Sequence, residues 1–251
     1  MRETFIIMGR LRSLSIVIPA YNEEQRLPEA LLLIAAYLET KELDFVEILA
    51  VDDGSRDGTA EVVREAAAAD PRIRLLQNPG NRGKGYAVRH GMQKAQGEWV
   101  LFTDADLSAP IEDLDRLEEA VRRENADGAI GSRALDRKLV LKHQPALREW
   151  VGRLFNLAMR LVTGLPYRDT QCGFKLFRRD VAQCVAARQQ CDGFGFDVEI
   201  LFIARKHGYR IVEVPVRWAN VEGTKVSLLK GLEAFLDPLR VRWNDLRGRY
   251  K

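Results

Sequence analysis

The chain has 251 residues, of which 39 are basic and 36 acidic, and the resulting net charge of +3 says little about partners. This length suits one large α/β domain with a sizeable core. Three cysteines without metal-ligand spacing indicate reduced thiols in a cytosolic chain. The longest apolar run, Ala30–Leu38, has nine residues, well short of the roughly 20 that a membrane-spanning helix needs.

The first 135 residues alternate between two hydrophobic periodicities. Short apolar runs that end in polar residues predict strands, and the segments between them have helical spacing. Strands are expected at 14–20, 45–53, 72–78, 98–106 and 127–135, and helices at 23–39, 57–70, 83–97 and 111–125. This order predicts a doubly wound, mainly parallel α/β sheet with helices on both faces.

The second half is less regular and locally basic. Its pattern predicts helices at 147–164 and 196–208, strands at 170–180 and 209–218, and an amphipathic segment at 225–246 that Pro238 should bend. Six basic and two acidic residues lie between Arg133 and Arg153, and such patches attract phosphates. The segments 147–164 and 225–246 fit helices that lie against lipid. For each of these two segments taken alone, packing on the core of the domain or a dimer contact is about equally consistent with the sequence.

Polar residues at the ends of the expected strands indicate the site. In doubly wound sheets, ligands bind beyond the carboxyl ends of the strands. Asp104 and Asp106 lie at the end of the fourth expected strand, separated by one residue, and their like charges repel each other unless solvent or a cation lies between them. Mg²⁺ or Mn²⁺, held by few protein ligands and by substrate phosphates, would remove the repulsion. Alternatively, Asp106 only caps the next helix.

The glycines of GNRGKG follow the third strand in an order that fits neither the dinucleotide nor the P-loop fingerprint. Four motifs of the first half are SIVIPAYNEE, VDDGSRDGT, NRGKGYAVRHG and TDADLSAP. They resemble motifs of the family 2 glycosyltransferases with the GT-A fold. Four further motifs are GSRAL, DTQCGFKLFRRD, GFGFDVEIL and VEVPVRWANVEGTKVSLLKG. They resemble motifs of one branch of this family, the dolichyl-phosphate (polyprenyl-phosphate) β-glucosyltransferases. The likeness covers nearly the whole chain from Ser13 onwards.

The resemblance implies a single GT-A domain over 1–251 with C-terminal amphipathic helices. Within it, a nucleotide-sugar-binding half would cover 13–133, an acceptor-binding half 134–225, and a basic amphipathic C-terminal helix 226–251. The implied reaction is inverting, metal-dependent transfer of glucose from UDP-glucose to a dolichyl or polyprenyl phosphate, with Mg²⁺ or Mn²⁺ as cofactor.

Individual residues acquire roles from the same resemblance. Tyr21 would lie near the base, Glu23 near the ribose, and Asp53 would accept from a ring N–H of the base. The other implied contacts are Pro19 and Lys84 to the nucleotide, Asp104 and Asp106 to the metal and donor, and Arg133, Arg148 and Lys225 to the acceptor phosphate. The related mannosyl-transferring branch has a glutamine where this chain has Ser108, which leaves a third protein ligand to the metal open.

The charge of the acceptor shapes the expected mechanism. A phosphate is largely ionised near neutral pH, so a nucleophile exists without an obligatory general base. If a carboxylate assists, Asp197 is the first choice and Asp169 the second. Each of them could equally well cap a helix start or a turn.

Several alternatives stay open. The donor could be GDP-mannose, the acceptor could be water-soluble, or the chain could bind a nucleotide sugar without turnover. No nucleic-acid partner is expected, because the basic residues lack the interleaved aromatic residues of a stacking platform.

Eukaryotic members carry an N-terminal membrane anchor that this sequence lacks. We therefore expect a cytoplasmic protein, peripheral at the cytoplasmic face of the membrane.

Overall fold

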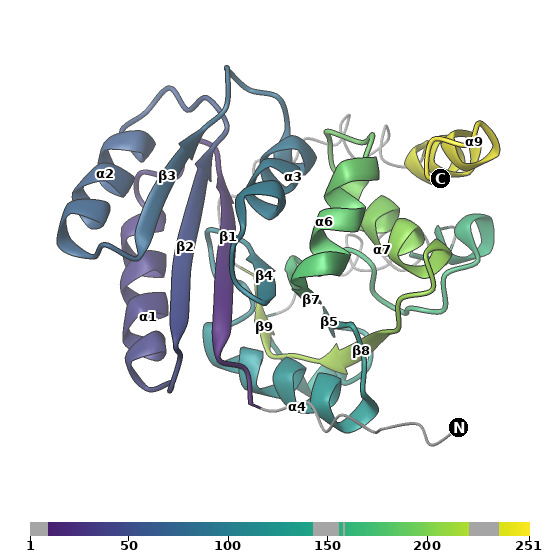
Figure 1. The fold of residues 1–251 in the computed structure, drawn as a ribbon, viewed down its shortest axis with the longest axis horizontal. Helices are drawn as coiled ribbons and strands as arrows, with labels where there is room; N and C mark the ends of the chain where they lie inside the picture. Colours follow the sequence, from purple (N-terminus) through teal and green to yellow (C-terminus); the bar gives the residue numbers. More distant parts are fainter. Residues whose placement is uncertain (1–9, 143–155, 158, 221–235) are drawn as a thin grey trace.

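The computed structural model describes residues 10–142, 156–157, 159–220 and 236–251. Seven strands form one sheet in the order β3-β2-β1-β4-β7-β5-β8, and helices cover both of its faces (Figure 1). A small two-stranded sheet pairs β6 with β9. The predicted α/β architecture with a mainly parallel sheet is confirmed.

The helices and strands follow the predicted segments closely in the first half. The strands are β1 Ser13–Ala20, β2 Phe45–Asp52, β3 Ile73–Gln77, β4 Trp99–Thr103, β5 Gly128–Ser132, β6 Val140–Lys142, β7 Phe174–Arg178, β8 Ile211–Pro215 and β9 Trp218–Ala219. The helices are α1 Leu27–Glu39, α2 Thr59–Ala69, α3 Lys84–Lys94, α4 Leu114–Glu124, α6 Arg179–Arg188, α7 Phe196–Lys206 and α9 Asp237–Leu246, with short 3₁₀ turns η1 Ile111–Asp113 and η2 Arg137–Leu139.

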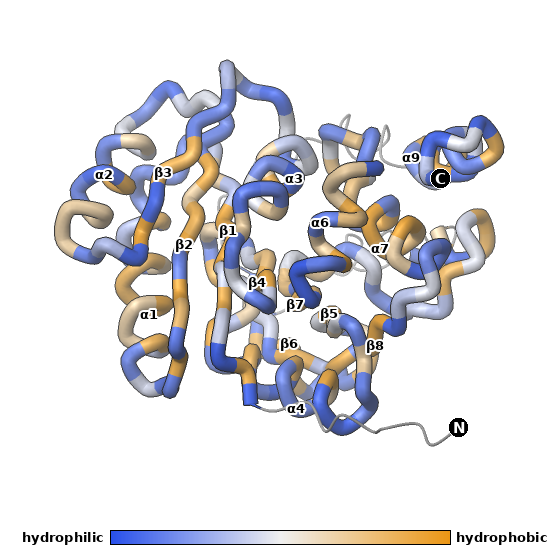
Figure 2. The backbone as a smooth tube through the Cα atoms, in the orientation of Figure 1, coloured by the Kyte–Doolittle hydropathy of each residue, from blue (hydrophilic) through white to orange (hydrophobic). Residues whose placement is uncertain are grey.

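Both faces of the sheet are buried. Side chains alternate across a strand, so Ile16 and Ile18 of β1 enter one core while Val17 enters the other. The first core lies under α1, α2 and α4, and the second lies under α3, α6 and α7. Figure 2 shows the apolar colour on the central strands and hydrophilic colour on many outlying loops. Strands buried on both faces explain the nearly continuous apolar runs in the sequence.

β7 departs from the parallel pattern. It lies between β4 and β5 and runs antiparallel to both. The sequence predicted a strand here but gave no direction for it. Because β5 and β8 join the sheet only through β7, this strand connects β1–β4 with β5 and β8.

The described part of the C-terminal segment packs on the second core. Val241 and Tyr250 are fully buried there. Pro238 lies in the first turn of α9, where its missing N–H is no loss. The predicted bend at Pro238 stays a prediction, because residues 225–235 of that segment lie outside the described residues. None of the described helices combines the length and the hydropathy needed to cross a bilayer.

Candidate functional site

The two predicted aspartates lie at the carboxyl edge of the sheet, directly after β4. The chain turns sharply there, because the Leu107 amide donates to the Asp104 carbonyl over 3.1 Å and Leu107 adopts a φ of 43°. The Ser108 amide donates to Asp106 Oδ1 over 3.0 Å. Both carboxylates remain partly exposed, as binding of a ligand would require.

Asp104 faces a lysine and a glycine. Lys84 Nζ lies 2.7 Å from Asp104 Oδ1. Burial lowers the pKa of Lys84, but Asp104 and Asp197 raise it more, so the side chain remains a cation. A Cβ on Gly173 would come within 2.1 Å of Asp104 Oδ2, which explains the glycine directly before β7.

The two aspartates fit a metal that takes most of its ligands from substrate. Asp104 Oδ1 is buried, and its charged neighbour is the Lys84 ammonium group at 2.7 Å. No group of three or more His, Cys, Asp and Glu side chains suited to a metal occurs among the described residues. Mg²⁺ usually binds one or two carboxylates together with waters and substrate phosphates, so Asp104 and Asp106 suffice.

A buried lysine that was not predicted from the sequence, Lys175, lies over the same Phe102 ring as Lys84. Lys175 of β7 is fully buried, and its Nζ donates to Asp197 and, over 2.6 Å, to the Cys172 carbonyl. The Nζ atoms of Lys84 and Lys175 lie 5.5 and 5.6 Å from the centre of the Phe102 ring. A lysine inside the apolar run GFKLF was the available signal.

Asp197 lies in the first turn of α7, where a helix start was predicted. Burial raises the pKa of Asp197, and Lys175 and Lys84 only partly oppose this effect. Opposite charges thus alternate in the order Asp104, Lys84, Asp197 and Lys175.

The second predicted carboxylate, Asp169, holds an arginine. Arg133 Nε donates to Asp169 Oδ2 over 2.6 Å, and an Nη2 hydrogen goes to Oδ1 over 2.8 Å. The Arg133 guanidinium also lies 5.4 Å from the Trp218 ring centre. Burial alone would raise the pKa of Asp169, but Arg133 lowers it below the ordinary value. This geometry suits Asp169 to orienting Arg133 more than to accepting a proton.

Asp53 supports the glycine-rich loop. Its buried carboxylate accepts hydrogen bonds from Asn78 Nδ2 and the Gly83 amide, both at 2.7 Å, and from the Arg82 amide. These contacts hold the loop that leads into Lys84. Contact of Asp53 with a base stays a prediction.

The loop after β1 completes this edge of the sheet. Pro19 lies near the end of β1, and Tyr21 and Glu23 follow it. Arg26 donates to both carboxylate oxygens of Glu23 at 2.7 and 2.6 Å, and the Glu23 amide donates to Thr59 Oγ1. The contacts of these residues with nucleotide stay predictions. Arg148 and Lys225, predicted to bind the acceptor phosphate, lie outside the described residues.

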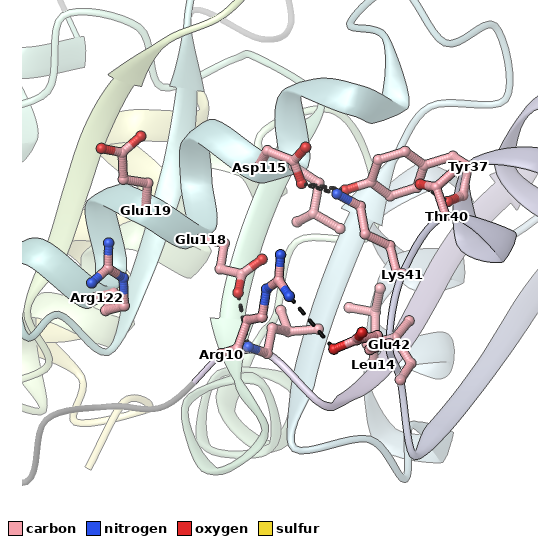
Figure 3. A pocket seen from close by; sticks show the side chains of 13 residues that line it. Arg10, Leu14, Tyr37, Thr40, Lys41, Glu42, Asp115, Glu118, Glu119 and Arg122 are labelled. Atoms are coloured by element: carbon pink, nitrogen blue, oxygen red, sulfur yellow. Dashed lines mark hydrogen bonds and ion pairs between the residues drawn. The ribbon is translucent and has the colours of Figure 1, made fainter.

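Two cavities differ in their relation to this edge. One of about 770 Å³ lies at the opposite edge, where the strands begin, and Asp115 there accepts from Tyr37 (2.8 Å) and Lys41 (2.5 Å) (Figure 3). The other, of about 550 Å³, opens beside Gly83 and Lys84. Since ligands of such sheets bind at the carboxyl ends of strands, the Asp104 edge is the candidate site.

Comparisons with known proteins show the family of the chain. Residues 15–186 match the model of glycosyl transferase family 2. The chain is 40% identical over 248 residues to the dolichyl-phosphate beta-glucosyltransferase ALG5A of Trichomonas vaginalis, covering 95% of this chain and 75% of the relative. It is 32% identical over 252 residues to the human dolichyl-phosphate beta-glucosyltransferase, covering 96% and 78% of the two chains.

Solved structures support the fold. Mannosyl-3-phosphoglycerate synthase from Rubrobacter xylanophilus aligns with a TM-score of 0.67 at 20% identity, over 95% of this chain and 75% of that one. Glucosyl-3-phosphoglycerate synthase from Mycobacterium tuberculosis, solved with Mn²⁺, UDP and glucosyl-3-phosphoglycerate, aligns with a TM-score of 0.63 at 20% identity, over 99% and 85%. These similarities show the GT-A fold of the chain.

Proposed function

The chain belongs to glycosyl transferase family 2, and we propose that it transfers glucose from UDP-glucose to the phosphate of dolichol or a related polyprenol. Its relatives of 32–40% identity carry the name dolichyl-phosphate beta-glucosyltransferase, which supports this acceptor and this sugar. One structural observation carries the proposal: Asp104 directly follows β4 and Arg133 directly follows β5, and both lie at the same edge of the sheet because both strands run antiparallel to β7.

Arg133 binds the acceptor phosphate in this proposal. A guanidinium can bind phosphate bidentately, and the two hydrogen bonds that Arg133 donates to Asp169 fix the plane of its guanidinium before the phosphate binds. Arg133 would hold the acceptor phosphate oxygen against the anomeric carbon of the donor, so that positioning supplies much of the rate enhancement. Arg148 and Lys225 would add further contacts to this phosphate.

The donor diphosphate needs positive charge. Mg²⁺ or Mn²⁺ on Asp104 and Asp106 would neutralise charge that develops on the departing UDP. Lys84 would assist from the glycine-rich loop, with Pro19, Tyr21, Glu23 and Asp53 around the nucleoside. Two solved structures of one protein of the same fold, glucosyl-3-phosphoglycerate synthase, contain Mn²⁺ or Mg²⁺ together with UDP, which supports a divalent ion.

No side chain has to remove a proton in this scheme, because the acceptor is already an anion. Asp197 is paired with Lys175 and faces Lys84, so its charge keeps the lysines in place. We propose that Asp197 acts through this electrostatic positioning, and that its role as a general base is secondary.

α9 supplies a surface for a membrane. Leu239, Trp243 and Leu246 are 55, 56 and 81% exposed and follow one another at helical spacing. Arg242 and Arg247 are exposed beside them. An apolar stripe flanked by arginines fits the interface of an anionic membrane. This supports peripheral attachment, for which we propose the cytoplasmic face.

The test is transfer of radiolabel by purified protein with Mg²⁺ and a short polyprenyl phosphate. UDP-glucose and GDP-mannose are offered in parallel, with Asp104→Asn as the control for the metal site. Label should pass from UDP-glucose into the lipid fraction. Transfer only from GDP-mannose would correct the donor. Nucleotide binding without a lipid product would refute the proposed acceptor.

A further inference from the structure

We propose that Trp218 is a positioning residue for the acceptor phosphate, because its ring supports the Arg133 guanidinium in the orientation that a phosphate needs. This role rests on the proposed function, in which Arg133 binds the phosphate of the lipid. No role was assigned to Trp218 from the sequence, although it lies within the motif VEVPVRWANVEGTKVSLLKG. The site therefore gains an aromatic residue from β9, a strand that pairs outside the main sheet.

Asp169 occupies one edge of the Arg133 guanidinium. This group carries several N–H donors in one plane. Two of them go to Asp169, from Nε at 2.6 Å and from Nη2 at 2.8 Å. One hydrogen on Nη1 and the second hydrogen on Nη2 are parallel to each other by covalent geometry, and they form a fork that matches two oxygens of a phosphate. Arg133 thus keeps a bidentate site while it is bound to Asp169.

Trp218 covers the face of the same guanidinium. The guanidinium carbon of Arg133 lies 5.4 Å from the centre of the Trp218 ring, within the reach of about 6 Å that a cation–π contact has. The ring excludes water from this face, so the attraction between Arg133 and an anion is less screened. The Arg133 side chain is still 29% exposed, whereas that of Asp169 is 2% exposed, so the arginine remains accessible to a ligand.

Hydrogen bonds on both sides of Trp218 hold β9 in place. The Arg217 amide donates to Asp113 Oδ2 over 2.5 Å, and Arg217 Nε donates to Oδ1 over 2.8 Å. Asp113 itself is buried in η1. The Ala219 amide donates to the Ser108 carbonyl over 2.9 Å. Because both neighbours are anchored, the Trp218 backbone is fixed before any phosphate binds.

The same anchors connect the acceptor arginine with the loop that carries Asp106. The Ser108 amide donates to Asp106 Oδ1, and the Ser108 carbonyl accepts from Ala219, next to Trp218. A path of hydrogen bonds therefore runs from Asp106 to the residue that covers Arg133. Since a displacement of about 1 Å between reacting groups can cost roughly 100-fold in rate, a fixed spacing of the two positions favours transfer.

A purely structural role for Trp218 has less support. Trp218 is half-buried, and it belongs to neither of the two hydrophobic cores of the described residues. Its replacement by another apolar residue should therefore cost little stability. A change in acceptor binding at unchanged stability is the result that a positioning role predicts.

Equilibrium binding in the absence of donor tests this role independently of catalysis. The probe is citronellyl phosphate, a short prenyl phosphate, titrated calorimetrically into the full chain. Trp218→Leu should raise its Kd about fivefold, because loss of a contact of about 1 kcal/mol lowers the population of the oriented arginine by that factor. Trp218→Phe keeps an aromatic face and should restore most of the affinity. Phe45→Leu, at the start of β2, is the matched control and should leave the Kd unchanged.

A double-mutant cycle shows whether Trp218 acts through Arg133. Arg133→Gln removes the cation but keeps a donor for Asp169. In that background, Trp218→Leu should have no further effect on the Kd. Steady-state transfer gives a second readout, in which Trp218→Leu should raise KM for the lipid phosphate by the same factor. KM for UDP-glucose and the unfolding temperature should stay unchanged.

Each contrary result has a distinct meaning. An unchanged Kd in Trp218→Leu, or an equal rise in the Arg133→Gln background, would overturn the role of Trp218 and leave the proposed acceptor intact. A lower unfolding temperature with a rise in both KM values would also overturn it, because Trp218 would then serve the fold. Failure of the wild type to bind citronellyl phosphate would refute the proposed acceptor, and with it this role. Binding that depends on Trp218 and Arg133, without glucose transfer, would support this role and refute the proposed donor.

Discussion

Replacement of Lys175 by methionine tests the buried charge pair most directly. Lys175 is fully buried, and it donates to Asp197, whose side chain is 5% exposed. Methionine keeps the length and apolar stem of the side chain but removes the ammonium group. The Asp197 carboxylate would then lose its nearest cation while it remains buried.

The size of the effect follows from what remains around Asp197. Removal of one partner from a buried ion pair costs about 3–5 kcal/mol. Lys84 still lowers the pKa of Asp197 and offsets part of the loss, so we expect the lower end, about 3 kcal/mol. Replacement of both partners, as in Lys175→Met with Asp197→Leu, should restore most of the stability, because apolar residues need no partner.

Urea unfolding of the three proteins measures this difference. The pKa of Asp197 is already raised by burial, and loss of Lys175 raises it further. The folded variant therefore binds a proton more readily, so its deficit should shrink as the pH falls from 7 towards 5. A loss below about 1 kcal/mol, or a double variant no more stable than the single one, would refute this reasoning.

Three further substitutions probe the site. Asp104→Asn should abolish metal-dependent transfer at an unchanged unfolding temperature, and activity that persists with the metal chelated would contradict this. Gly173→Ala should displace the Asp104 carboxylate, because its Cβ would lie 2.1 Å from Oδ2, and a wild-type rate would refute the contact. Arg133→Lys keeps the charge but loses the two-pronged bond to Asp169, so KM for the lipid phosphate should rise roughly tenfold or more. An unchanged KM would remove Arg133 from the acceptor site.

The sequence predicted the first half of the fold well because its signals are local. Each strand of 13–133 is a short apolar run with a polar end, and each helix has its own periodicity. The direction of β7 could not be predicted, because antiparallel and parallel pairing place the same residues on the same faces. Only the path of the chain through space decides between the two.

The site was predictable where a motif carries it and unpredictable where distant residues meet. Asp104 and Asp106 were predicted from their spacing at a strand end, and the structure places both directly after β4. The contact of Lys175 with Asp197 joins residues 22 positions apart on different elements, and no periodicity reports such a pair. Asp169 was found as a carboxylate, but its two bonds to Arg133 span 36 positions and appear only in the folded chain.

The central position of β7 also has a consequence for synthesis on the ribosome. β4 and β5 emerge first, yet the strand that pairs with both of them comes more than 40 residues after β5. Until then, one edge of β4 and both edges of β5 lack a partner, and unpaired edges of apolar strands promote association between chains. A nascent chain released at residue 133 should therefore aggregate or recruit chaperones more than one released after residue 178, in which β7 can pair with both β4 and β5.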